Sequence, residues 1–136
     1  MKRLEFTLLV LFICFCAKAQ YNKDVVLEPI LKTDTTSIGQ KIVYPNFAND
    51  EVSIVKVTLP PGKSTGWHKH TFPVFAYIMQ GTLTVEIENR KSIQFSANSS
   101  FSEVINTLHN GINNGTDDVV LIAFFMGEKG KPLSVH

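Results

Sequence analysis

Alternation of apolar and polar residues with a period of two is the feature that most restricts the fold of this chain. In residues 82–88, leucine, valine and isoleucine alternate with threonines and glutamates, as expected for a strand with one buried and one solvated face. Residues 119–126 form a continuous apolar run that ends at Gly127, which predicts a buried strand. From residue 20 onwards, no window has apolar residues at helical spacing behind a capping residue. The chain is therefore predicted to be all-β.

Turn residues separate the predicted strands. Pro60-Pro61-Gly62 ends one strand, because prolines remove hydrogen-bond donors and glycine permits a positive φ. Asn89-Arg90 follows the alternating segment and has the residue types of a hairpin turn. Many short strands joined in this way favour a small antiparallel β-barrel or a two-sheet jelly roll, since either hides the sheet edges. With 136 residues, of which 44% are hydrophobic, the chain fits a single domain.

Residues 1–19 have the pattern of a cleaved signal peptide. Two basic residues precede an apolar run over residues 6–16, and Ala17-Lys18-Ala19 offers small residues at both positions that a signal peptidase reads. The run is too short for the roughly 20 residues that a transmembrane helix needs. We therefore expect cleavage before Gln20 and a secreted or periplasmic protein with no membrane attachment afterwards. Both cysteines of the sequence would leave with this segment.

The rest of the chain divides into three parts. Residues 20–39 are interpreted as an N-terminal arm, residues 40–128 as the β-barrel domain, and residues 129–136 as a C-terminal tail. The arm contains five apolar residues with no obvious place in a small barrel, and these are Val25, Val26, Leu27, Ile30 and Leu31. An apolar arm is readily buried against the sheet edge of a neighbouring molecule. The arm therefore predicts a homodimer in which two copies exchange arms.

Composition excludes several classes of function. The formal net charge is +1 and 18% of residues are charged, so no basic surface indicates a nucleic-acid partner. With both cysteines in the predicted signal peptide, cysteine chemistry is excluded from the mature site. Function is therefore expected to reside in a local site that binds a small molecule.

Three of the four histidines form a candidate metal site. His68 and His70 are two residues apart, and in a strand such residues project to the same face. A third imidazole from His109 on a neighbouring strand would complete a set suited to a divalent transition metal, namely Fe, Zn, Mn, Ni or Cu. On spacing alone, a pair of surface histidines on a strand is an equally good interpretation.

The sequence around these histidines resembles the two motifs of the cupin superfamily. Residues 62–81 match the first motif, with a glycine at each end and the two histidines in register. His109 and Asn113 match the second motif. The resemblance covers residues 40–128 and is similar to small single-domain cupins of the type-2 kind. It implies a small β-barrel or jelly roll whose interior holds a metal.

One departure from the first motif affects the ligand set. Val74 stands where the cupin motif has a glutamate ligand. Three neutral imidazoles would remain, an arrangement similar to that of cupin-type thiol dioxygenases and of three-histidine zinc sites; loss of the metal is the alternative. Glu103 lies six residues before His109 and would share its face if both belong to one strand. Glu103 is thus a candidate ligand or acid–base residue, and a solvated strand charge is the other interpretation.

These observations lead to one functional hypothesis and one alternative. The hypothesis is an exported cupin that binds a divalent metal through His68, His70 and His109 and acts on a small molecule by oxygenase or isomerase chemistry. Glu103 and Tyr77 are its candidate catalytic residues, because either could move a proton. The alternative is a non-catalytic module that binds a small molecule or a carbohydrate. The fold alone does not decide whether the protein is an enzyme.

Overall fold

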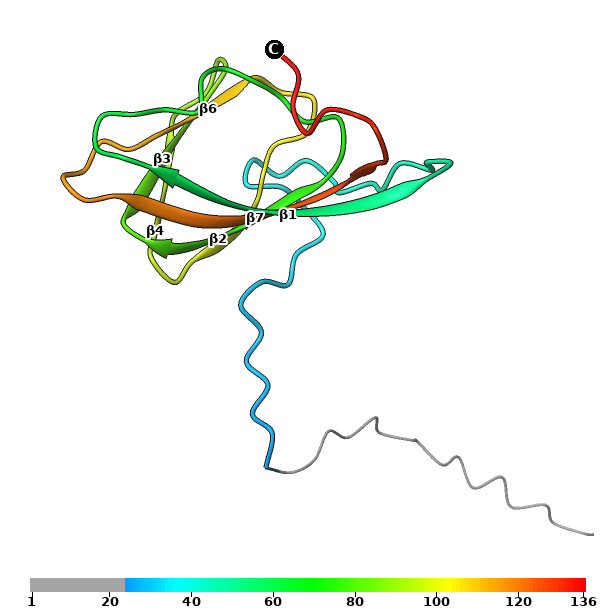
Figure 1. Cartoon of the computed structure of the whole chain (residues 1–136), viewed down its shortest axis with the longest axis horizontal. Coiled ribbons are helices and arrows are strands. Elements are labelled where there is room, and N and C mark those ends of the chain that lie inside the picture. The colour runs from blue at the N-terminus through cyan, green and yellow to red at the C-terminus, as the bar shows by residue number, and fades with distance from the viewer. Residues whose placement is uncertain (1–23) are drawn as a thin grey trace, which may run out of the picture.

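The computed structural model describes residues 24–136 and contains two antiparallel sheets that face one another (Figure 1). The strands are β1 (Asp50–Leu59), β2 (Val74–Gln80), β3 (Thr82–Ile87), β4 (Ile93–Ser96), β5 (Ser100–Ser102), β6 (His109–Ile112) and β7 (Val119–Glu128). The all-β prediction is confirmed. The predicted signal peptide, residues 1–19, lies outside the described residues. Within residues 24–136, no helix has the length and apolar character needed to cross a membrane.

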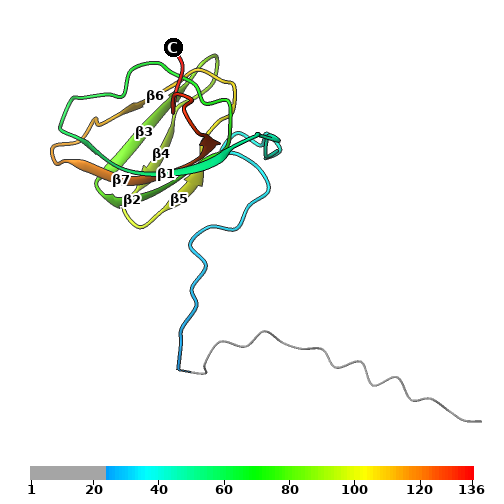
Figure 2. The same ribbon diagram turned by 45° about the vertical axis from the view of Figure 1, so that its right-hand side comes forward.

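The strand order places the two longest strands in one sheet. The larger sheet has the order β1-β7-β2-β5, and the smaller has the order β4-β3-β6. The second view shows the smaller sheet lying across the inner face of the larger one (Figure 2). Apolar side chains from both sheets fill the space between them, with Val74, Ile78 and Val119 completely buried. The fold is therefore a single two-layer β-domain.

Strand β7 explains the long apolar run seen in the sequence. Its residues alternate between buried and half-buried along the whole strand. Leu121, Ala123 and Phe125 are buried between the sheets, whereas Ile122 and Phe124 lie on the outer face. The run is therefore apolar on both faces although only one face is enclosed by the described part of the chain.

The segments before β1 and after β7 both contact the barrel. Residues 24–34 are exposed, and Thr35 pairs with Lys41 within the segment before β1. The amide of Ser37 then donates to the carbonyl of Ser102 at 3.0 Å. At the other end, Val135 pairs with Lys69. Within the described residues, the segment 35–39 of the predicted arm is therefore partly buried against the domain, and the predicted tail pairs with it.

Candidate metal centre

The two histidines of the H-x-H segment lie in the extended connection between β1 and β2. His68 pairs with His109 through two backbone hydrogen bonds of 3.0 and 2.9 Å. Lys69 pairs with Val135 on the opposite side, and His70 pairs with Ile105. Because successive residues of an extended chain project to opposite sides, residues two apart project to the same side, and the two imidazoles enter the interior together, as the sequence spacing predicts.

Glu103 and His109 come from different segments. Glu103 directly follows β5, and its amide donates to the carbonyl of Val74 at 2.9 Å. His109 is the first residue of β6 and lies opposite Ile87 of β3. The chain between them turns at Asn106, whose φ is 51°. The expectation that Glu103 and His109 share one strand is therefore wrong, although their side chains do meet.

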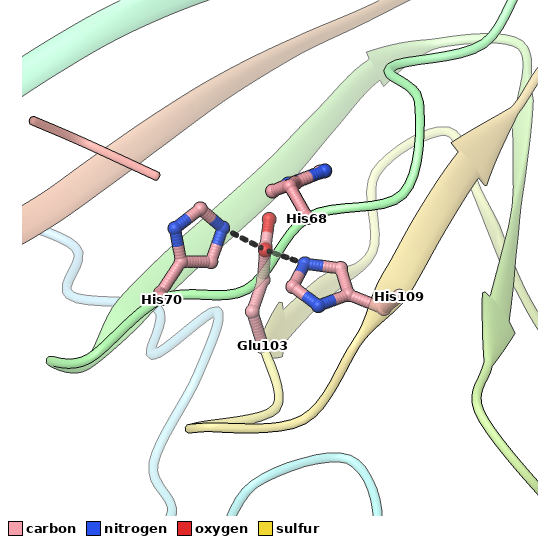
Figure 3. A group of neighbouring side chains, drawn as sticks. All are labelled: His68, His70, Glu103 and His109. Carbon is pink, nitrogen blue, oxygen red and sulfur yellow. Dashed lines mark hydrogen bonds and ion pairs between the residues drawn. The ribbon is translucent and has the colours of Figure 1, made fainter. Parts of the chain in front are cut away.

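Four side chains converge on one point between the sheets (Figure 3). The ligand atoms of His68, His70, Glu103 and His109 all lie within 4.8 Å of one another. Oε2 of Glu103 is 2.9 Å from Nε2 of His70 and 3.0 Å from Nε2 of His109. His70 and His109 are each 3% exposed, so the group is shielded from solvent on most sides. It offers three nitrogen donors and one oxygen donor.

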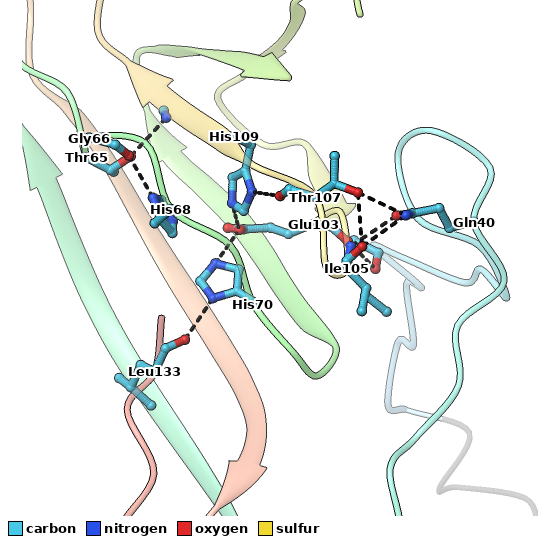
Figure 4. Close-up of polar contacts among 12 residues, drawn as sticks. Gln40, Thr65, Gly66, His68, His70, Glu103, Ile105, Thr107, His109 and Leu133 are labelled. Carbon is cyan, nitrogen blue, oxygen red and sulfur yellow. Dashed lines mark hydrogen bonds and ion pairs between the residues drawn. The ribbon is translucent and has the colours of Figure 1, made fainter. Parts of the chain in front are cut away.

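A backbone carbonyl contacts the Nδ1 atom of every histidine in this group (Figure 4). His68 contacts the carbonyl of Gly66 at 2.8 Å, and His109 contacts that of Thr107 at 3.0 Å. His70 contacts the carbonyl of Leu133 at 2.7 Å, from 63 residues along the chain. A carbonyl can only accept, so each Nδ1 carries a hydrogen and Nε2 is left to bind a metal. The residues therefore fit a divalent transition metal.

The side chain of Gln40 forms hydrogen bonds with the segment between Glu103 and His109 (Figure 4). Its amide nitrogen donates to the carbonyl of Ile105 at 3.0 Å and to the hydroxyl of Thr107 at 3.2 Å. The amide of Ile105 donates back to the Gln40 side-chain oxygen at 3.0 Å. Thr107 is the residue whose carbonyl orients His109. The segment before β1 thus supports the candidate site through this one side chain.

The electrostatic environment couples Glu103 to its histidine neighbours. Burial alone would raise the pKa of the Glu103 carboxyl, but hydrogen bonds with His109 and His70, and the charges of those rings, lower it from 4.5 to about 2. Burial alone would lower the pKa of His109, but its hydrogen bond with Glu103 and the carboxylate charge raise it above 6.5. Burial lowers the pKa of His68 below 6.5. In the metal-free protein, a carboxylate therefore faces a ring that readily holds a proton.

A cavity of about 80 Å³ adjoins the four side chains. His68, His70, Glu103 and His109 contribute to its wall, and Thr65 and Gly111 also line it. Apolar side chains of three strands form most of the remaining wall, among them Val57, Leu59, Leu83, Val85, Leu121 and Phe125. A small molecule in this cavity would lie against the histidines and an apolar surface at once.

The structure does not bring Tyr77 to this site. Val74, Ala76 and Ile78 are the residues of β2 that face the interior, since they are buried and alternate with half-buried residues. Tyr77 is out of phase with them, and its hydroxyl donates to the side-chain oxygen of Asn98 at 3.1 Å. It is not among the residues that line the cavity. Its predicted role in proton transfer therefore finds no support in the geometry.

Two contributors to the site were missed by the sequence analysis. Leu133 contacts His70 through its backbone carbonyl, a group that every residue has, so no residue type in the sequence indicates this contact. Gln40 is half-buried at the predicted border between arm and barrel, and a single amide that hydrogen-bonds to a distant loop follows no periodic pattern.

Comparison with known proteins identifies the domain. Residues 55–125 match the family described as the cupin domain. Among solved structures, a cupin domain from Bordetella pertussis Tohama I is similar with a TM-score of 0.51 and 25% identity, and the match covers 60% of this chain and 86% of that one. A comparison with curated protein sequences finds no match.

Larger cupin-like enzymes share the fold at lower identity. The lyase of Ruegeria pomeroyi DSS-3 that acts on DMSP has a TM-score of 0.54 and 13% identity, with coverage of 62% of this chain and 42% of that one. An oxalate oxidase in complex with the substrate analogue glycolate has a TM-score of 0.53 and 22% identity, with coverage of 62% and 45%. Each match thus covers less than half of the enzyme chain, and these two likenesses concern the fold alone.

Proposed function

This chain belongs to the cupin family, and we propose that it binds one divalent transition metal through His68, His70, His109 and Glu103. The observation that carries the proposal is the convergence of four ligand atoms within 4.8 Å. Each histidine presents Nε2 because a carbonyl holds its Nδ1. Donor type and orientation both match what Fe, Zn, Mn, Ni or Cu requires.

The proposed activity is chemistry on a small molecule, of the oxygenase or isomerase type. A bound metal would supply Lewis-acid polarisation and a coordination position for a substrate. Glu103 can complete the ligand set, or it can hold a proton beside a substrate, because its carboxylate lies between His70 and His109. The apolar strands around the cavity keep bulk water away from that position.

The cavity wall favours this proposal over a carbohydrate-binding module. A sugar presents a hydroxyl on nearly every carbon, and each buried hydroxyl needs a hydrogen-bond partner. The wall opposite the histidines consists of aliphatic and aromatic side chains such as Leu83, Leu121 and Phe125. A carbohydrate would leave most of its hydroxyls without partners there.

A competition titration tests the metal site. Purified, tag-free protein is titrated with Zn²⁺ or Co²⁺ against a chelator of known affinity. We expect one ion per chain and a loss of at least about 100-fold in affinity for His109→Ala, because the variant removes a ligand. Lys91→Ala is the control, because Lys91 is exposed between β3 and β4 and lies outside the four-residue group. Equal affinities for wild type and His109→Ala would refute the proposal.

We also propose that the protein is exported after cleavage before Gln20. The support is the order of basic residues, apolar run and Ala17-Lys18-Ala19 at the start of the sequence. The intact mass of the protein recovered from its native compartment tests this. A product that begins at Gln20 is expected, and a product that retains Cys14 and Cys16 would contradict it.

The outer face of the larger sheet supports a homodimer. Strand parity places nine apolar or aromatic side chains on this face, and these are Val52, Ile54, Phe75, Tyr77, Met79, Val120, Ile122, Phe124 and Met126. Val52 and Ile54 are 58% and 63% exposed. The arm is equally apolar, with Val26 89% exposed. We propose that the arm of a second copy covers this face, since each surface would bury the other.

Light scattering at micromolar concentration tests the dimer. Wild-type protein is expected at twice the mass of one chain, and Ile54→Glu at the mass of one, because the variant puts a charge into the proposed interface. Lys91→Glu is the control and should remain dimeric, because Lys91 is exposed between β3 and β4 and lies outside this face. Monomeric wild-type protein would overturn this part of the proposal.

A further inference from the structure

We infer that the ligand of the cavity is a small molecule with one metal-binding group and an uncharged, apolar remainder. The inference rests on the proposed metal site and specifies its substrate class. It follows from three properties of the cavity: the wall offers no charge partner, its polar atoms are already hydrogen-bonded, and its volume is small.

The residues that line the cavity include no lysine and no arginine. The charged or chargeable groups among them are the four residues of the proposed metal site itself. A second anionic group on a ligand would therefore be buried without a cationic partner, which is strongly unfavourable.

The remaining polar atoms on the wall already have partners. The hydroxyl of Thr65 accepts from the amide of Gly111 at 2.9 Å and lies 3.2 Å from the carbonyl of Gly66, to which it donates. The amide of Thr65 donates to the carbonyl of Gly111 at 2.9 Å. The Nδ1 atoms of the three histidines contact carbonyls. A ligand therefore has the metal and Glu103 as polar partners, and the rest of it meets hydrocarbon.

The volume limits the size of that remainder. An apolar cavity of roughly 150 Å³ holds a benzene ring, whereas this cavity has a volume of about 80 Å³. A benzene-sized group therefore does not fit without displacement of a wall residue. Leu121, which is 4% exposed and belongs to the wall, is the residue whose truncation would enlarge the space. A short branched alkyl group is the size that matches.

Ligand binding to the Co²⁺-loaded protein tests the charge preference. The visible absorption of Co²⁺ reports its coordination, so the readout does not depend on turnover. The probes are 3-methylbutanohydroxamate and malonomonohydroxamate, which share a metal-binding group and differ by an isopropyl group in place of a carboxylate. We expect the first to bind at least tenfold more tightly. Equal or tighter binding of malonomonohydroxamate would overturn the inference.

A second pair of hydroxamates tests the size limit of the cavity. Acetohydroxamate should bind wild-type protein at least tenfold more tightly than benzohydroxamate, and Leu121→Ala should gain at least tenfold for benzohydroxamate alone. If wild-type protein binds both probes equally, the size limit is refuted, whether or not the variant folds. If Co²⁺ does not bind at all, the proposed function fails and this inference fails with it. If Co²⁺ binds but neither hydroxamate preference is observed, this inference is refuted and the proposed metal site is not.

Discussion

The amide of Glu103 donates a hydrogen bond of 2.9 Å to the carbonyl of Val74, so the carboxylate of the site lies on the segment next to the valine that replaces the motif glutamate. Val74 is completely buried in the core, and Glu103 reaches the histidines from the adjacent strand end. The chain therefore retains three imidazoles and one carboxylate, with the carboxylate supplied from a different position. This arrangement is the basis of the predictions that follow.

Replacement of the Glu103 carboxylate should weaken metal binding. Glu103→Gln keeps the shape of the side chain but removes the charge and leaves a weaker oxygen donor, so we expect the affinity for Zn²⁺ to fall by about 10- to 100-fold. Competition with a chelator measures this. Glu88→Gln is the control, because Glu88 is exposed in the turn that follows β3. An unchanged affinity in Glu103→Gln would show that the carboxylate takes no part in the site.

Introducing the motif glutamate at position 74 should lower the stability of the protein without raising its metal affinity. Because Val74 is completely buried in the core and Glu103 already provides a carboxylate, Val74→Glu buries a second negative charge. We expect a loss of about 3 kcal/mol or more in the free energy of unfolding and no gain in metal affinity. Denaturant unfolding and a Zn²⁺ titration measure the two quantities. Tighter metal binding at unchanged stability would mean that position 74 is still a ligand position.

Part of this site could be predicted from the sequence. The spacing of His68 and His70 is a local property of an extended chain, so their common direction follows from strand geometry. Glu103 was chosen by parity along a single strand, yet the structure places a turn at Asn106 between Glu103 and His109. The same parity, applied to β2, separates Tyr77 from its buried neighbours Ala76 and Ile78.

The rest depends on contacts between distant segments. The carbonyl that orients His70 comes from Leu133, 63 residues away. Because every residue has a backbone carbonyl, the sequence does not indicate which one contacts His70. The two-layer β-fold was predictable, because alternation and turn residues are repeated along the chain. The run 119–126 also predicted a buried strand, but no pattern in it distinguishes a covered outer face from an exposed one.

Detachment of the C-terminal tail should disturb His70. The amide of Val135 donates to the carbonyl of Lys69 at 3.0 Å, which holds Leu133 near His70. Val135→Pro removes that donor, so we expect about a tenfold loss of Zn²⁺ affinity and a mixture of His70 tautomers in the nitrogen NMR spectrum of the metal-free protein. Val135→Ala keeps the donor and serves as the control. A single Nδ1–H tautomer together with unchanged affinity in Val135→Pro would show that the tail has no such role.

Metal affinity should depend on pH through His109. Its pKa is raised above 6.5 by Glu103, so a proton occupies the ring below that pKa and competes with the metal. Affinity is therefore expected to fall as pH drops through the raised pKa of His109, by up to about tenfold per pH unit for one released proton. Burial lowers the pKa of His68, so a proton on that ring competes at lower pH than a proton on His109. Titrations at a series of pH values check this dependence, and in Glu103→Gln the fall should begin at lower pH. Affinity that is constant with pH would contradict the proton competition.

The metal content of the protein tests the central claim most directly. Protein expressed without a histidine tag, purified and passed through a desalting column, is analysed by elemental mass spectrometry beside the His70→Ala variant. We predict about one divalent transition-metal ion per wild-type chain and less than a tenth of that in the variant. Wild-type protein that contains no stoichiometric metal, and that takes up none of Fe²⁺, Zn²⁺, Mn²⁺, Ni²⁺ or Cu²⁺ on incubation, would contradict the account.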